Sequence, residues 1–136
     1  MGRTSEAMMF DSDVLIWCLC GDPVAGRVVN TESERATSIV SLIELLQGAG
    51  SPAQLKVARD FVRKLELRLL PVTEAISYKA VSLIEKHAPS AGLQLGDALI
   101  AATALEHDET LVIGNIRHFR AIPGLKIKPF RHSGVH

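Results

Sequence analysis

Residues 8–17 read Met8-Met9-Phe10-Asp11-Ser12-Asp13-Val14-Leu15-Ile16-Trp17 and place two carboxylates between two apolar runs. Carboxylates flanked by segments that favour burial carry a large desolvation cost unless cations or hydrogen-bond donors receive them. Such a local conflict is typical of functional sites. Asp11 is therefore the first candidate site residue, and the N-cap of a following helix is its alternative role.

The composition is that of a folded chain. Of its 136 residues, 47% are hydrophobic and 22% are charged, which indicates a globular protein rather than a disordered one. This length suits a single domain with a sizeable core. We expect a flexible N-terminal tail over residues 1–7, one domain over residues 8–130 and a C-terminal tail over residues 131–136.

The apolar runs and the cysteines indicate where in the cell the protein is expected to be. The longest near-apolar runs, residues 14–20 and 98–105, are far shorter than the roughly 20 residues of a membrane-spanning helix. The N-terminus also lacks a hydrophobic signal core. Cys18 and Cys20 are poorly spaced for a disulfide, so we expect two small buried thiols. These features predict a cytoplasmic protein without membrane contact.

Charge points to a partner only through its distribution. Lysines plus arginines equal aspartates plus glutamates at 15 each. After Glu109, however, the sequence has no further acid and carries several basic residues. A basic C-terminal end suits an anionic partner such as RNA, and a solvated face is the alternative.

Short apolar segments alternate with amphipathic ones along the chain. Strands are predicted at residues 8–10, 36–40, 69–72, 110–113 and 125–127. Helices are predicted at residues 14–19, 23–30, 41–48, 52–67, 73–87 and 95–107, with a chain break at residues 89–92. This alternation predicts an α/β fold with a parallel sheet covered on both faces. Functional groups gather at the carboxyl ends of such strands, and Asp11 and Asn115 both follow predicted strands.

Asp97 is the second candidate acid. On a helix it shares a face with three apolar residues, Ile100, Ala101 and Ala104. Its carboxylate should therefore lie at the edge of the core rather than in bulk water. The alternative is stabilisation by the helix dipole, worth about 0.3–1 kcal/mol, which explains an exposed acid better than an aligned one. The pattern favours a functional role.

Glu44 is the third candidate acid and lies inside an apolar segment, residues 42–46. Ser41-x-x-Glu44 also fits a capping box, in which the glutamate accepts the amide proton of the cap residue. From this motif alone, capping is favoured.

Asp13 is expected to be a helix N-cap that could assist Asp11. Asn115 is compatible with a simple turn residue, and a surface or core-edge position is favoured for His118.

Three acids from three segments form a candidate cluster. Like charges brought together repel one another unless they are protonated or bridged by cations. An all-oxygen set without histidine or cysteine spacing points to Mg²⁺ or Mn²⁺ rather than zinc. Such ions can activate water and stabilise an in-line displacement at phosphorus.

Four motifs in this order resemble the PIN-domain ribonucleases, specifically the VapC-like toxins of type II toxin–antitoxin systems. The strand–Asp–Ser/Thr motif is similar to residues 10–16, and Ser/Thr-x-x-Glu-Leu to residues 41–45. Asp-x-x-Ile-Ala-Ala is similar to residues 97–102, and the closing strand–Asn–x-x-x-Phe motif to residues 111–119. Each motif is weak alone, but four in this order and spacing are specific. The resemblance extends from residue 8 to about residue 129.

The resemblance implies a three-layer α/β/α sandwich with a short parallel sheet. It also implies a Mg²⁺-dependent endoribonuclease in which Mn²⁺ can substitute, a cognate antitoxin and a homodimer. Asp11, Glu44 and Asp97 would hold the metal, and Asn115 would occupy the fourth catalytic position. We expect supporting hydrogen bonds and RNA contacts from a further set of residues: Ser12, Asp13, Ser41 and His118 beside the acids, and Arg117 and Arg120 on RNA.

The closing motif departs from the family. Ile113 and Gly114 replace a hydroxyl and a basic residue, and His118 stands where some relatives carry aspartate. A neutral residue at 115 would weaken a second metal, so one metal is expected. The alternative function is a PIN-like binding module with weak or lost catalysis that acts mainly through its antitoxin. A phosphoacceptor receiver domain is a further rival, but its mid-sheet aspartate and late lysine are missing.

Overall fold

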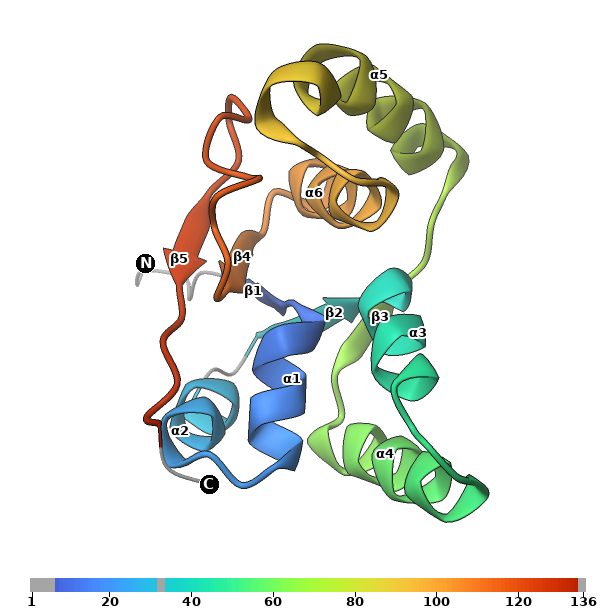
Figure 1. The fold of residues 1–136 in the computed structure, drawn as a ribbon, viewed down its shortest axis with the longest axis vertical. Helices are drawn as coiled ribbons and strands as arrows, with labels where there is room; N and C mark the ends of the chain where they lie inside the picture. The colour runs from blue at the N-terminus through green and yellow to red at the C-terminus, as the bar shows by residue number, and fades with distance from the viewer. Residues whose placement is uncertain (1–6, 32–33, 135–136) are drawn as a thin grey trace, which may run out of the picture.

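A computed structural model describes residues 7–31 and 34–134 of the chain. The five strands of these residues form one sheet in the order β3-β2-β1-β4-β5, and each strand pairs in parallel with its neighbours (Figure 1). The strands are β1 (Met8–Phe10), β2 (Arg35–Ser38), β3 (Arg68–Leu70), β4 (Thr110–Ile113) and β5 (Ile127–Pro129). The predicted parallel α/β sheet is confirmed.

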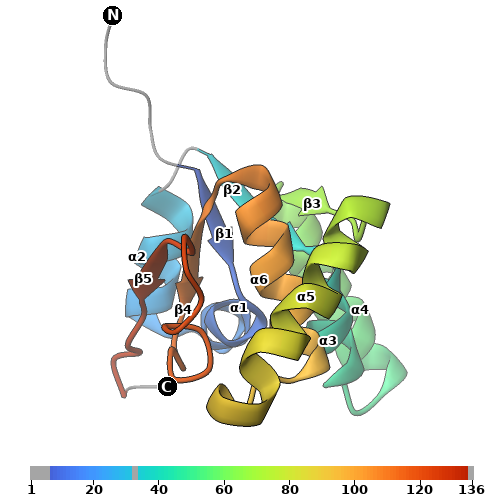
Figure 2. The same ribbon diagram turned by 90° about the horizontal axis from the view of Figure 1, so that it is seen from above.

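Helices cover both faces of this sheet. They are α1 (Ser12–Leu19), α2 (Pro23–Thr31), α3 (Ile39–Gln47), α4 (Pro52–Leu65), α5 (Glu74–Ala91) and α6 (Leu95–His107). Helices α5 and α6 pack together on one side, and α1, α2 and α4 lie on the other (Figures 1 and 2). The three-layer α/β/α sandwich is therefore confirmed.

The sheet separates two hydrophobic cores, and β1 contributes to both. Successive side chains of a strand point to opposite faces. Met9 accordingly packs with the α5–α6 layer. Met8 and Phe10 pack with α1, α2 and α4. Because β1 is covered on both faces, its sequence is a continuous apolar run rather than an alternating one.

The start of α3 differs from the prediction, and the difference matters for the site. Strand β2 ends at Ser38, and the helix begins at Ile39 rather than at Ser41. The Ser38 side chain accepts the amide proton of Ser41 at 2.9 Å and is the N-cap. Glu44 therefore lies within the helix, and the capping-box interpretation of Ser41 and Glu44 is wrong.

Two further boundaries were predicted wrongly. Helix α5 continues through Pro89 to Ala91 and ends at Gly92, whose φ of +71° favours glycine. Strand β5 begins at Ile127, two residues later than predicted. Its register is set by β4, which pairs Leu111 with Ile127.

The strand order reverses beside β1. The chain passes from β1 to β2 and β3 on one side of the sheet and then crosses to β4 on the other side. In open parallel sheets the crevice at such a switch point is the usual binding site. Asp11 follows β1, Gly114 follows β4, and α6 begins close to the same edge. The topology thus brings distant segments to one edge.

The described part of the expected C-terminal tail packs on the domain. Ser133 donates from its amide, at 3.0 Å, and from its hydroxyl to Oδ1 of Asp22, which is buried before α2. Residues 1–6 and 135–136 of the expected tails lie outside the described residues. Cys20 is exposed rather than buried, which corrects that expectation. Within the described ranges, no helix combines the length and the apolar character that crossing a membrane requires.

Candidate active site at the carboxyl edge of the sheet

Asp11 lies directly after the central strand and is mostly shielded from water. Its backbone is at the N-cap position of α1, but its side chain makes no cap hydrogen bond. The carboxylate instead accepts the Ser41 hydroxyl at 3.2 Å, and Ser38 donates to Ser41 at 3.1 Å. Burial and the charges of Asp13 and Glu44 raise the pKa of Asp11 from 3.8 to about 7, against hydrogen bonds from Ser12 and Ser41.

Glu44 extends from α3 toward the start of α1. Its Oε1 accepts the Ser12 hydroxyl at 2.9 Å. Its other oxygen lies close to α6, because a Cβ built on Gly96 would sit 3.0 Å from Oε2. Glu44 is exposed to solvent. An exposed glutamate held between two other helices is positioned to meet a ligand from solution.

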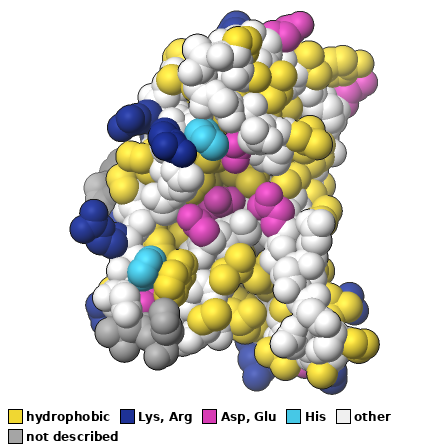
Figure 3. Space-filling model, in the orientation of Figure 1, with side chains coloured by type: hydrophobic (Ala, Val, Ile, Leu, Met, Phe, Trp, Pro, Cys, Tyr) yellow, Lys and Arg dark blue, Asp and Glu magenta, His cyan; other side chains and the backbone are white. Residues whose placement is uncertain are grey.

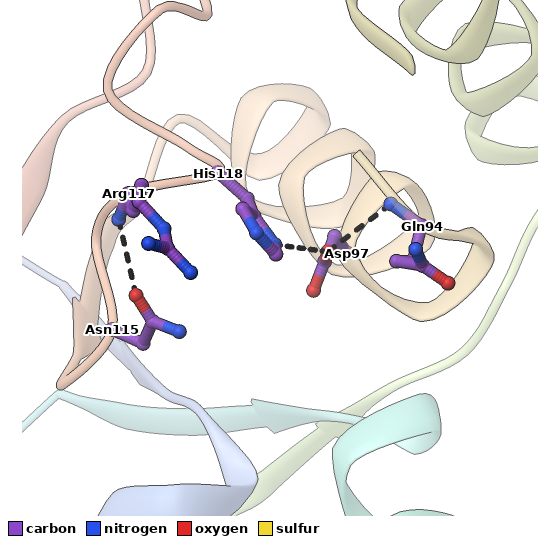
Figure 4. A network of polar contacts seen from close by, with 5 residues as sticks. All are labelled: Gln94, Asp97, Asn115, Arg117 and His118. Carbon is purple, nitrogen blue, oxygen red and sulfur yellow. Dashed lines mark hydrogen bonds and ion pairs between the residues drawn. The ribbon is translucent and has the colours of Figure 1, made fainter. Parts of the chain in front are cut away.

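Asp97 is fixed from two sides at the first turn of α6. Its Oδ2 accepts the Gln94 amide at 3.1 Å and lies 3.2 Å from Nδ1 of His118, and both contacts are drawn in Figure 4. Its side chain is 25% exposed, and the next turns of α6 are buried. The predicted position at the edge of the core is therefore correct. Asp97 also accepts the backbone amide of Gln94, the N-cap residue of α6, and this local role was not predicted from the sequence.

Asp13 has a different role from the predicted N-cap. It lies in the first turn of α1, and its Oδ2 accepts the Gly114 amide at 2.9 Å. Its Oδ1 is buried without a hydrogen-bond partner in the structure. Burial raises the pKa of Asp13, and the amides of Gly114, Val14 and Asn115 oppose that rise. Asp13 thus ties α1 to the loop after β4.

The loop after β4 carries Asn115, Arg117 and His118. The Asn115 side-chain oxygen accepts the Arg117 amide at 3.3 Å, which is the geometry of a turn residue (Figure 4). Arg117 and Arg120 are exposed. Of this loop, His118 is the residue that contacts a candidate metal ligand directly.

Acidic side chains gather in the middle of one face, below a histidine and two basic side chains (Figure 3). Within residues 7–31 and 34–134, no three acidic, histidine or cysteine side chains converge to enclose a bare ion. Mg²⁺, however, keeps several waters and binds through one or two carboxylates plus substrate phosphate. The all-oxygen donors and the raised pKa of Asp11 fit such a hydrated cation, because positive charge is what this cluster lacks.

Three features of this region were not predicted. Asp22 caps α2 by accepting the Ala25 amide at 3.0 Å, a role that Asp-Pro at a helix start could have indicated. Gly96 leaves space for Glu44. Trp17 stacks on His132 from the far end of the chain, and no local sequence signal marks that contact.

A parallel α/β/α sandwich with carboxylates at its switch point is the arrangement expected of a metal-dependent hydrolase site. The PIN domain matches residues 8–125, and the chain belongs to this family. It is 35% identical to ribonuclease VapC10 of Mycobacterium tuberculosis over 132 residues, 93% of this chain and 96% of that protein. It is 31% identical to ribonuclease VapC19 of the same organism over 123 residues, 87% of this chain and 96% of that protein.

A solved structure agrees with these relatives. The chain matches one from a toxin–antitoxin complex of Klebsiella pneumoniae with a TM-score of 0.74 and 26% identity. The match covers 88% of this chain and 95% of that chain. The predicted resemblance to VapC-like PIN-domain proteins is confirmed.

Proposed function

We propose that this protein is a divalent-metal-dependent endoribonuclease and the toxin of a type II toxin–antitoxin pair. The observation that carries the proposal is the position of Asp11. It lies at the switch point of a PIN fold among like charges, with a pKa raised to about 7. Its relatives include proteins named as ribonucleases.

The roles proposed for the acids follow from their contacts. Asp11, Glu44 and Asp97 would hold the cation, and Mg²⁺ is the proposed metal because all three offer hard oxygen ligands. When bound, the cation would supply activation of water and neutralisation of charge on the phosphate. One metal is favoured, because Asn115 is neutral and its side-chain oxygen already accepts the Arg117 amide.

The neighbouring residues orient these acids. The Ser41 and Ser12 hydroxyls hold one oxygen each of Asp11 and Glu44. His118 and the Gln94 amide hold Asp97. Arg117 and Arg120 are exposed near this edge and would contact RNA phosphates. Residues held by fixed neighbours need little rearrangement when substrate arrives.

An antitoxin and a second copy of the chain are the proposed protein partners. Apolar side chains lie directly below the acids on the face shown in Figure 3, and an apolar hollow between α1, α3 and α4 is lined by Ile16, Leu45 and Val57. An antitoxin segment bound there could reach the acids.

On α5 and α6, Tyr78, Val81 and Leu95 are strongly exposed and suit a homodimer contact. The proposed location is the cytoplasm.

Cleavage of single-stranded RNA tests the enzymatic proposal. The wild type should cleave with Mg²⁺ or Mn²⁺ and stop in EDTA, and Asp11→Asn and Asp97→Asn should lose activity. Asp108→Asn is a matched control, because Asp108 follows α6 at the opposite end from Asp97. Full activity of both site variants in EDTA would refute the proposal. A folded sample that binds no Mn²⁺ by isothermal titration would favour the binding-module alternative.

A further inference from the structure

A second cleft lies beside the acidic edge. It holds about 410 Å³ and is lined by Asp13, Trp17, Asn115, Phe130, Arg131 and His132. Asp13 lies in the first turn of α1, two residues after Asp11, so the cleft adjoins the proposed metal site on the Asp13 side. Arg131, another lining residue, is exposed.

Two stacked rings form one wall of this cleft. The ring centroids of Trp17 and His132 are 3.7 Å apart, and the ring planes differ by 14°. The Gly134 amide donates to Nδ1 of His132 at 3.0 Å, which leaves Nε2 to carry the proton of the neutral ring. His132 itself is exposed. An exposed ring held flat against tryptophan is a stacking platform ready for a further planar group.

The segment that carries His132 is anchored below the surface. Ser133 bonds twice to Asp22, which also caps α2. Although desolvation opposes it, hydrogen bonds from Ser133 and Ala25 hold the pKa of Asp22 below its ordinary value. Asp22 is therefore a charged acceptor at neutral pH, which strengthens the bonds from Ser133. This anchor fixes the imidazole before any ligand arrives.

We propose that this cleft binds one nucleotide of a single-stranded RNA substrate next to the cleavage point. The base stacks on the face of the His132 ring that is turned away from Trp17, and Arg131 contacts an adjacent phosphate. Unpaired bases stack readily on aromatic side chains, and arginine is suited to phosphate. This inference rests on the proposed ribonuclease function, because it assigns a subsite to the same substrate.

The lining favours a nucleotide over a peptide. A planar ring pair and an arginine in the same lining match the planar base and the anionic phosphate of one nucleotide. The apolar hollow between α1, α3 and α4 is a separate surface that suits a peptide side chain better. Asp13 in the lining would repel phosphate, but it lies only two residues after Asp11, where the proposed cation would offset its charge.

Trp17 is the only tryptophan of the chain, so its fluorescence reports on this cleft. The full chain is titrated in Ca²⁺ with a short single-stranded RNA, and a denaturing gel checks that the RNA stays intact. An abasic oligonucleotide of the same length and inorganic phosphate are titrated in parallel. RNA should quench Trp17 and the other two should not. Equal quenching by the abasic oligonucleotide would overturn base stacking.

Variants of His132 separate stacking from mere support of the fold. His132→Ala should weaken RNA binding about fivefold or more and leave binding of the abasic oligonucleotide unchanged. His132→Phe should retain RNA binding, and His107→Ala is the control because His107 lies at the far end of α6. Equal losses on both oligonucleotides would make His132 structural only. Quenching by a cognate antitoxin peptide but not by RNA would likewise overturn the inference.

The two proposals fail in different ways. If the wild type cleaves RNA with Mg²⁺ but His132→Ala keeps the wild-type KM and affinity, the nucleotide subsite is refuted and the ribonuclease stands. If RNA binds with base-dependent quenching but no metal supports cleavage, the ribonuclease is refuted and the base-binding cleft stands.

Discussion

The Gly114 amide donates to Oδ2 of Asp13 at 2.9 Å, and a Cβ on residue 114 would sit 2.7 Å from the same oxygen. A real side chain cannot occupy that position unless Asp13 or the loop moves. The carboxylate of Asp13 therefore fills the place that a larger residue at 114 would take. A residue larger than glycine at this position would therefore require Asp13 or the loop after β4 to shift.

Replacing Gly114 with alanine should destabilise the protein through this clash. We expect a loss of about 1–3 kcal/mol in the free energy of unfolding, measured by urea denaturation. The loss should be smaller in an Asp13→Ala background, because the clashing oxygen is gone. Gly26→Ala is the control, since its Cβ would meet nothing within 4 Å. Equal losses in both backgrounds would contradict the proposed clash.

Gly96→Ala should lower RNA cleavage without lowering the stability of the fold. The new Cβ would lie 3.0 Å from Oε2 of Glu44 and push this flexible carboxylate aside. Because alanine is a better helix former than glycine, unfolding free energy should be unchanged or rise by up to about 1 kcal/mol. RNA cleavage with Mg²⁺ should fall several-fold. Unchanged cleavage would mean that the position of Glu44 is not critical.

The metal-free protein should lose stability as the pH rises. The folded-state pKa of Asp11, about 7, exceeds its ordinary value of 3.8, so the folded state binds the proton more tightly. Stability from this group is complete below about pH 4 and is lost progressively as the pH rises through 7.

Asp11→Asn tests this pH dependence. At pH 8 it should stabilise the metal-free protein by a few kcal/mol, because each pKa unit corresponds to about 1.4 kcal/mol. Thermal melts in EDTA between pH 4 and pH 8 measure the effect, with the exposed Glu85→Gln as control. Because burial also raises the pKa of Asp13, a smaller pH dependence should remain in Asp11→Asn, and one as large as in the wild type would assign the effect to another group.

His118→Ala should weaken the binding of the Mg²⁺ that supports cleavage. Removing the partner of Asp97 should raise the Mg²⁺ concentration for half-maximal activity about tenfold or more. His118→Asn keeps a hydrogen-bond donor and should lose less. His87→Ala, on α5, is a second histidine variant for comparison. If His118→Ala and wild type show the same Mg²⁺ titration, His118 does not position Asp97.

Local patterns predicted most elements and the environment of Asp97. Its apolar neighbours along one helix face placed it correctly at the core edge. The capping-box interpretation of Ser41 and Glu44 was wrong because Ser38 and Ser41 both suit an N-cap, and only the length of β2 decides between them. The end of α5 was misread because Pro89 lies in the last turn, where the helix tolerates it before Gly92.

Local sequence patterns did not predict the long-range contacts. Asp13 bonds to Gly114, and Trp17 stacks on His132, across nearly the whole chain. Such contacts depend on which strands become neighbours, and sequence spacing carries no record of that. The family motifs predict the acids of the proposed site, but they do not indicate the cleft beside them.

The pairing of β1 with β4 joins an early strand to a late one. A chain growing on the ribosome exposes Asp11 long before Asp97 and β4 have been made. The acids are thus kept apart through most of synthesis, and the edge that would cut RNA forms only near its end. A chain that stops before α6 would lack both Asp97 and β4 and so could not bring the three acids together at this edge.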